Sequence, residues 1–140
     1  MVAVRLSPSP PMKSASAMTR AAVIGAGVMG EGIAECFAEA GLEVVVTDVE
    51  EEALERCVAQ IAANVEASAR YGVVQESAET ICGRITTIAA EGVVDEIRNC
   101  DVVIEAAPEI LQLKRELFAG LDSAPIDTLL ATNTSSMTVS

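Results

Sequence analysis

The chain has 140 residues, enough for one domain with a buried core, and 51% of its residues are hydrophobic, which is typical of globular rather than disordered proteins. Its formal net charge of −12 argues against a nucleic-acid partner, because phosphate backbones are held by clustered lysine and arginine. Four cysteines occur without a C-x-x-C pair and without any histidine, so neither a metal site nor a disulfide framework is predicted.

The first 18 residues are predicted to lie outside the fold. The segment MVAVRLSPSPPMKSASA is rich in proline and serine and contains no acidic residue. Its prolines would break the amphipathic helix of a transit peptide. Residues 1–18 are therefore expected to be a disordered tail, or to precede a true start at Met18. No secretory signal and no apolar run of about 20 residues is found, which favours a soluble protein in the cytoplasm.

Strands and helices are predicted to alternate over residues 19–140. Strands are expected in the segments AAVI (21–24), LEVVVTD (42–48), RITTIA (84–89), CDVVIEAAPE (100–109) and DTLLATNTSS (127–136). Helices are expected after the first strand, over residues 50–69, in a short stretch after the third strand, and over residues 109–121. Strands that are apolar on both faces and separated by helices predict a doubly wound parallel α/β sheet, incomplete, with about five strands.

The helix expected after the first strand has an amphipathic pattern. Three apolar residues recur at helical spacing and are predicted to face the sheet: Ile33, Phe37 and Ala40. Three glutamates four residues apart are predicted to line the solvent-exposed face: Glu31, Glu35 and Glu39. Gly41 is expected to end this helix, since glycine adopts the backbone conformation that follows a helix end.

The loop GAGVMG connects the first strand to this helix with G-x-G-x-x-G spacing. In this pattern the first glycine permits a tight turn, the second lets a diphosphate approach the main chain, and the third lets the helix pack closely on the strand. The N–H groups and the positive end of the helix can then hold an anion without a cationic side chain. The candidate diphosphate-binding residues are Gly25, Ala26, Gly27, Val28, Met29 and Gly30.

Asp48 ends the second expected strand, about 20 residues after the glycine loop, where an acid accepts hydrogen bonds from the ribose hydroxyls of adenosine. Residues 49–52 include three glutamates and no arginine. They would repel a 2′-phosphate, so NAD is predicted rather than NADP. Together these features predict a Rossmann-type NAD-binding domain over residues 19–140. In the alternative interpretation, the glycines only form a turn and Asp48 only caps the next helix.

Three segments resemble the NAD-binding domain of the L-3-hydroxyacyl-CoA dehydrogenases, a family that includes 3-hydroxybutyryl-CoA dehydrogenases. They are VIGAGVMGEGIAECFAEAGLEVVVTD (23–48), CDVVIEAAPEILQLKRELFAGLD (100–122) and LLATNTSSMTVS (129–140). The resemblance runs from about Arg20 to the last residue. Few dinucleotide-binding domains combine E-x-x-x-E-x-x-x-x-K with T-N-T-S-S, so the last two segments are the more specific.

The resemblance implies an oxidoreductase of fatty-acid metabolism that uses NAD to oxidise an L-3-hydroxyacyl-CoA to the 3-oxoacyl-CoA, with an acyl-CoA substrate and a homodimeric parent. It implies that Glu109 and Lys114 lie beside the nicotinamide ribose. Lys114 would also lie near the CoA side of the substrate. Asn133 and Ser135 would approach the nicotinamide and the substrate's 3-oxygen, where an amide or hydroxyl orients the reacting C–O bond.

Each of these residues also has a simpler interpretation. Glu109 could be only a charge at a helix start, Lys114 part of a solvated helix face, and the Asn-Thr-Ser-Ser run a turn after a strand.

Two features depart from the family pattern. Residues 64–71 offer Arg70 as their one cation, where the family often presents serine or lysine to CoA, so CoA contacts there are in doubt.

The second departure concerns the catalytic base. In the family this base is a histidine in a strand that would follow Ser140, and the chain contains no histidine. The chain alone is therefore expected to be inactive.

Two alternatives remain open: a non-catalytic NAD-binding module, and a dehydrogenase of the 3-hydroxyisobutyrate or 6-phosphogluconate group. Asp48 and the Asn-Thr-Ser-Ser loop count against the latter group.

Overall fold

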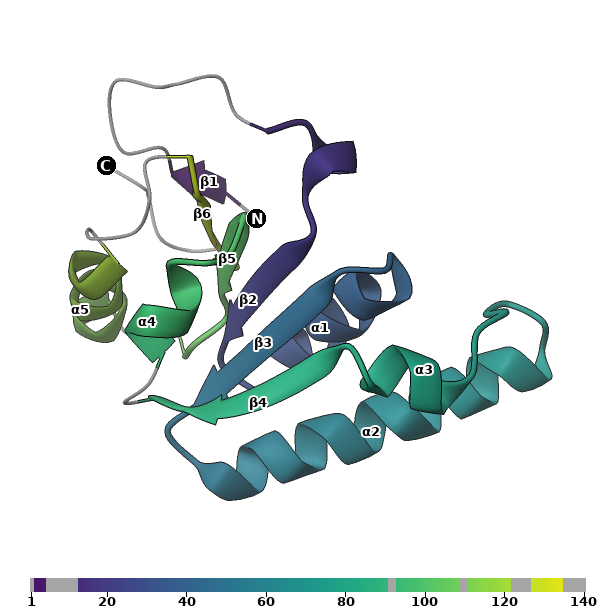
Figure 1. Ribbon diagram of the computed structural model, residues 1–140. Coiled ribbons are helices and arrows are strands. Elements are labelled where there is room, and N and C mark those ends of the chain that lie inside the picture. The colour runs from purple at the N-terminus through teal and green to yellow at the C-terminus, as the bar shows by residue number, and fades with distance from the viewer. Residues whose placement is uncertain (1, 5–12, 91–92, 109–110, 122–126, 135–140) are drawn as a thin grey trace.

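The computed structural model describes residues 2–4, 13–90, 93–108, 111–121 and 127–134. These residues build one six-stranded sheet in the order β1-β6-β5-β2-β3-β4 (Figure 1). The strands are β1 (Val2–Val4), β2 (Arg20–Ile24), β3 (Glu43–Asp48), β4 (Ile85–Ala89), β5 (Val102–Glu105) and β6 (Leu129–Thr132). Five neighbouring strands of this sheet, β6, β5, β2, β3 and β4, pair in parallel. The predicted doubly wound sheet with five parallel strands is therefore confirmed.

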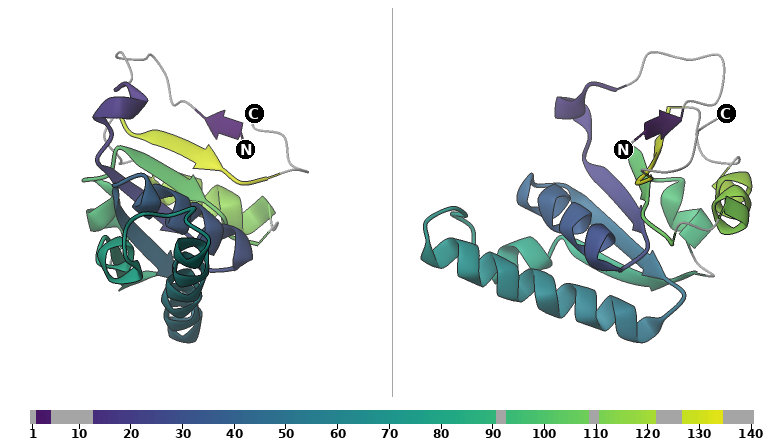
Figure 2. Two further views of the ribbon diagram at one scale, coloured as in Figure 1. Left: turned by 90° about the vertical axis from the view of Figure 1, so that its right-hand side faces the viewer. Right: turned by 180° about the vertical axis from the view of Figure 1, so that it is seen from behind.

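Helices cover both faces of this sheet (Figure 1). One face carries α1 (Val28–Glu39), α2 (Glu51–Arg70) and α3 (Ala78–Cys82), and the other carries α4 (Val93–Ile97) and α5 (Leu111–Gly120). Figure 2 shows α2 extending well past the strands. Within the described part of the chain, no helix has the length and apolar character that a membrane crossing requires.

The short helix α3 is absent from the sequence prediction, although its boundary signals are present in the sequence. Ser77 precedes α3, and its hydroxyl oxygen accepts a hydrogen bond from the N–H of Thr80 at 3.1 Å. Gly83 directly follows the helix. A serine cap at one end and a glycine at the other are the ordinary signals of a helix start and stop.

The face of α1 that packs on the sheet is predicted only in part. Gly30, Ala34 and Ala38 are the buried residues of α1, while Ile33 and Phe37 are half-buried and Ala40 is exposed. Small residues at four-residue spacing let the helix lie close against the strands, and Ile33 and Phe37 pack beside them on buried residues of β2, β5 and β6. Ala40 is the one residue of the three predicted ones that lies outside this face.

The predicted solvent face of α1 is also partly wrong. Glu39 is exposed, but Glu31 and Glu35 are only half-exposed. The side-chain amide of Asn64 on α2 donates to Glu35 Oε2 at 2.9 Å and contacts Glu31 Oε1 at 3.4 Å. Because α2 packs beside α1, it shields two of the three glutamates. Helical periodicity alone does not show where a second helix will dock.

The structure places regular elements in the segment predicted to be a disordered tail. β1 pairs antiparallel with β6, with Val2 opposite Thr132 and Val4 opposite Leu130. Ala15–Ala17 form a turn of 3-10 helix before β2. Without β1, the outer edge of β6 would present unpaired main-chain groups. The Val-Ala-Val segment has the β propensity to pair with them.

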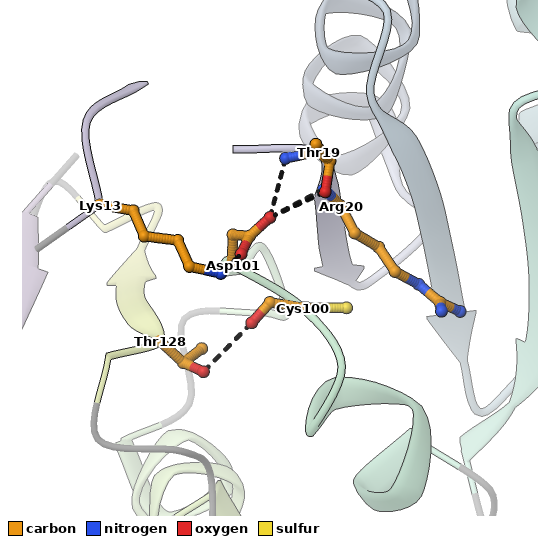
Figure 3. Close-up of polar contacts among 6 residues, drawn as sticks. All are labelled: Lys13, Thr19, Arg20, Cys100, Asp101 and Thr128. Atoms are coloured by element: carbon orange, nitrogen blue, oxygen red, sulfur yellow. Dashed lines mark hydrogen bonds and ion pairs between the residues drawn. The ribbon is translucent and has the colours of Figure 1, made fainter. Parts of the chain in front are cut away.

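Asp101 anchors the start of β2 to the start of β5 (Figure 3). The carboxyl is 8% exposed. Its Oδ2 accepts hydrogen bonds from the N–H groups of Thr19 at 2.8 Å and Arg20 at 3.1 Å. Its Oδ1 lies 2.5 Å from the ammonium of Lys13. The hydrogen bond from Lys13, followed by those from the main chain, lowers the pKa of Asp101 from 3.8 to about 2.

We expect this carboxylate to make stability depend on pH. Its folded pKa lies below the unfolded value, so its contribution is complete above pH 3.8 and is lost as the pH falls towards 2. Asp101→Asn should lower the free energy of unfolding by about 2 kcal/mol at pH 7 and should flatten the acid limb of the stability curve. Urea unfolding at several pH values measures both, with the exposed Glu66→Gln as the control for loss of one charge. An unchanged acid limb would contradict this account.

Candidate dinucleotide-binding site

The site lies at the carboxyl ends of the strands, where the chain order reverses. β2 pairs with β3 on one side and with β5 on the other. The chain leaves β2 towards α1 on one face of the sheet and leaves β5 towards α5 on the other face (Figure 1). A crevice at this switch point is the usual ligand position in open α/β sheets. The glycine loop occupies this position.

Gly25 and Gly30 have positions that no other residue fits. Gly25 has a φ of +107°, and a Cβ there would lie 2.7 Å from the carbonyl oxygen of Ala106 in the loop after β5. A Cβ on Gly30 would overlap the carbonyl oxygen of Gly25. The first glycine therefore makes the tight turn, and the last one lets α1 pack directly on the loop, which are the structural roles the sequence pattern predicts.

Gly27, in contrast, faces open space. It is the N-cap of α1, and a Cβ placed on it would meet no atom within 4 Å. The first hydrogen bond of the helix runs from the N–H of Glu31 to the carbonyl oxygen of Gly27 at 2.8 Å. The N–H groups of residues 28–30 precede that bond and have no acceptor within the helix. Together with the helix dipole they make a candidate anion site, which a diphosphate could approach closely.

Asp48 stands against the glycine loop. Its Oδ2 accepts the N–H of Ala26 at 2.7 Å, and its Oδ1 accepts the N–H of Glu50 at 3.0 Å. A carboxylate offers about four lone-pair sites, so two ribose hydroxyls can still donate to it. The bond to Glu50, the N-cap of α2, shows that Asp48 also supports the helix start. Binding of the ribose by Asp48 and support of the start of α2 by Asp48 are therefore compatible interpretations.

The surroundings of Asp48 are negatively charged. Burial raises the pKa of the Cys57 thiol to about 11, and the charges of Glu31 and Asp48 add to the rise. A pocket of about 770 Å³ between α2 and β4 begins at Asp48, with Glu51 and Glu55 in its lining. These carboxylates would repel a 2′-phosphate, which supports the preference for NAD.

Lys114 does not lie on a solvated helix face. It is 5% exposed, and its Nζ donates to Glu105 Oε2 at 2.9 Å and lies 3.5 Å from Thr132 Oγ1. The interpretation of Lys114 as a solvent-facing charge is therefore wrong. Glu105 is a residue of this cluster that the sequence analysis does not predict, although it is the first acid of the E-x-x-x-E-x-x-x-x-K motif and the last residue of a fully buried strand.

Asn133 directly follows β6 at the same end of the sheet. Its N–H donates to the carbonyl oxygen of Glu105 at 2.7 Å. Glu105 therefore brings together Lys114 and Asn133, the two described residues predicted to lie near the nicotinamide. The predicted Glu109 and Ser135 lie outside the described residues.

The strand order, the glycine loop at the switch point and the acid at the end of β3 define a dinucleotide-binding domain of the Rossmann type. A family model described as "3-hydroxyacyl-CoA dehydrogenase, NAD binding domain" matches residues 20–140. The chain belongs to this family, as the sequence resemblance predicted.

Curated relatives agree with this assignment. The chain is 39% identical over 120 residues to the 3-hydroxyadipyl-CoA dehydrogenase of Escherichia coli (strain K12), a match that covers 84% of this chain and 25% of the relative. It is 36% identical over 126 residues to the 3-hydroxybutyryl-CoA dehydrogenase of Bradyrhizobium diazoefficiens, covering 89% of this chain and 42% of the relative. The chain therefore spans less than half the length of these relatives.

Solved structures show the same fold. The crystal structure of 3-hydroxybutyryl-CoA dehydrogenase from Escherichia coli K12 matches with a TM-score of 0.78 and 38% identity, over 86% of this chain and 25% of that chain. The structure of FadB2 from M. tuberculosis matches with a TM-score of 0.78 and 35% identity, over 86% and 42% of the two chains.

Proposed function

We propose that this chain is the NAD-binding portion of an oxidoreductase that oxidises L-3-hydroxyacyl-CoA to 3-oxoacyl-CoA. The observation that carries the proposal is the pairing of Asp48 with the glycine loop at the switch point, where Asp48 Oδ2 holds the N–H of Ala26 at 2.7 Å. This arrangement offers separate acceptors and donors for the sugar and the diphosphate of one dinucleotide. The names of the relatives support the acyl-CoA substrate class.

Each part of the cofactor has a proposed partner on this chain. The N–H groups of residues 28–30 hold the diphosphate, and Asp48 accepts the adenosine ribose hydroxyls. Lys114 and Asn133 face the nicotinamide half, together with Glu109 and Ser135 as the resemblance implies. Bound NAD supplies the hydride acceptor. The protein contributes binding and orientation, since a held geometry lowers the entropic cost of reaction.

The 140 residues contain no histidine, so we propose that the chain binds NAD without transferring hydride by itself. A non-catalytic NAD-binding module is the second candidate, favoured by the same absence. Titration of the chain with NADH, followed by an assay with acetoacetyl-CoA and NADH, should show binding without turnover. Turnover near that of an intact relative would contradict the first proposal. The intact mass of the natural protein separates the two candidates.

The same proposal includes a homodimeric parent that acts in the cytoplasm on an acyl-CoA. Support comes from the family resemblance and from the described cysteines, which are free thiols, as in reducing compartments. Sedimentation of the parent protein tests its oligomeric state.

Asp48→Ala should weaken NADH binding by about 1–3 kcal/mol, the scale of lost hydrogen bonds to a charged group. Fluorescence titration of NADH on the 140-residue chain measures the change. Glu52→Gln is the matched control, because Glu52 is a 90% exposed carboxylate in the first turn of α2. The control should bind NADH with the affinity of the unaltered 140-residue chain. Equal affinities of all three proteins would remove Asp48 from the site and take the main support from the proposal.

A further inference from the structure

Glu105 is a charged residue at a position where charge is unfavourable. Its side chain is 0% exposed at the end of β5, a strand whose four residues are all buried. A buried carboxylate persists only where hydrogen bonds and an opposite charge replace water. The donors around Glu105 therefore indicate what the residue does.

The donors to the Glu105 carboxylate come from three different segments. The N–H of Ala107, in the loop after β5, donates to Oε1 at 2.5 Å. The ammonium of Lys114 on α5 donates to Oε2 at 2.9 Å, and the hydroxyl of Thr132, at the end of β6, donates to the same oxygen at 2.5 Å. Its carbonyl oxygen also accepts the N–H of Asn133. One residue thus connects the loop, the helix and the neighbouring strand end.

We propose that Glu105 is a positioning residue for the nicotinamide half of the cofactor. Its carboxylate holds the Lys114 side chain and its carbonyl oxygen holds the Asn133 main chain, so the ammonium of Lys114 and the backbone that carries Asn133 are fixed before the cofactor binds. This inference rests on the proposed function. A lysine has many rotamers, and fixing it in advance removes an ordering cost that binding would otherwise carry.

The adenosine half does not depend on Glu105 in this arrangement. Asp48, which takes the adenosine ribose, ends β3, and β2 lies between β3 and β5. The diphosphate binds at the start of α1. A change at Glu105 should therefore affect NADH more than ADP, which shares the adenosine and the diphosphate but lacks the nicotinamide riboside. A purely structural ion pair would affect the two ligands alike.

The experiment compares NADH and ADP on the full chain and on two variants. Glu105→Gln keeps the side-chain size and an acceptor for Ala107 but removes the charge that holds Lys114. Thr132→Val keeps the ion pair and the shape but removes one donor to Oε2. Kd for NADH comes from its fluorescence, and Ki for ADP comes from displacement of NADH. Circular dichroism and thermal melting show which variants fold.

We expect Glu105→Gln to raise Kd for NADH about tenfold and to leave Ki for ADP within about twofold. Thr132→Val should raise Kd for NADH by a smaller factor with the same selectivity, and it decides the question if Glu105→Gln does not fold. Equal losses for both ligands, or no loss for NADH in the folded variants, would overturn the inference. Failure of the unaltered chain to bind NADH would instead overturn the proposed function, and this inference with it.

Discussion

Replacing Gly30 by alanine is expected to destabilise the protein by about 3 kcal/mol. The new Cβ would overlap the carbonyl oxygen of Gly25 and would lie 2.9 Å from its carbonyl carbon. Both atoms are main chain, and Gly25 is itself fixed by its φ of +107° and by the loop after β5. The overlap is relieved only if α1 moves away from β2, which opens the core around Ala34 and Ala38.

A second substitution in α1 provides the control. Gly32 lies in the same helix, is exposed, and has no atom within 4 Å of the position of a Cβ. Gly32→Ala should stabilise the protein by about 0.5–1 kcal/mol, because alanine has the higher helix propensity. Urea unfolding monitored by circular dichroism measures both variants. The contact between α1 and the glycine loop would be in doubt if Gly30→Ala were as stable as the unaltered chain.

The topology could be predicted because local signals repeat along the chain. Apolar runs such as AAVI are too short for helices, and the segments between the strands have helical spacing. For a chain that alternates in this way, the parallel sheet with helices on both faces is the arrangement that buries every apolar face. The antiparallel β1 has no such signal, because its pairing with β6 depends on which strand edge is left free.

The fully buried residues of α1 differ from the predicted ones for another reason. Hydrophobicity ranks Ile33 and Phe37 above Ala34 and Ala38, but contact with a sheet at short distance selects for size. The glycine at position 30 fixes α1 close to β2, so residues four and eight positions later must also be small. The G-x-G-x-x-G geometry therefore accounts for the small residues at the centre of this face, with Ile33 and Phe37 packed beside them.

The polar cluster around Glu105 could not be predicted, for a reason of geometry. Lys114 is nine residues away along the chain and Thr132 is 27 residues away. Their meeting depends on the path of the loop after β5 and on the pairing of β5 with β6. Sequence spacing indicates neighbours within one helix or one strand, and none of these contacts lies within one element.

Replacing Gly27 by alanine is expected to leave the fold intact and to weaken cofactor binding at least about tenfold, or about 1.4 kcal/mol. Gly27 has an ordinary φ of −74°, and a Cβ there meets no atom of the protein within 4 Å. The unfolding free energy should therefore change by no more than about 1 kcal/mol, the scale of exchanging one N-cap residue for another. The methyl group instead occupies the space in front of the first N–H groups of α1.

This substitution separates the diphosphate from the rest of the cofactor. NADH and ADP share the diphosphate, so Gly27→Ala should weaken both by a similar factor, whereas Gly32→Ala on the same helix should weaken neither. NADH fluorescence and displacement by ADP measure the two affinities, and urea unfolding shows that the fold is retained. Undiminished affinity in a stably folded Gly27→Ala protein would mean that the diphosphate does not lie against the main chain of the loop. The open space at Gly27 would then need another explanation.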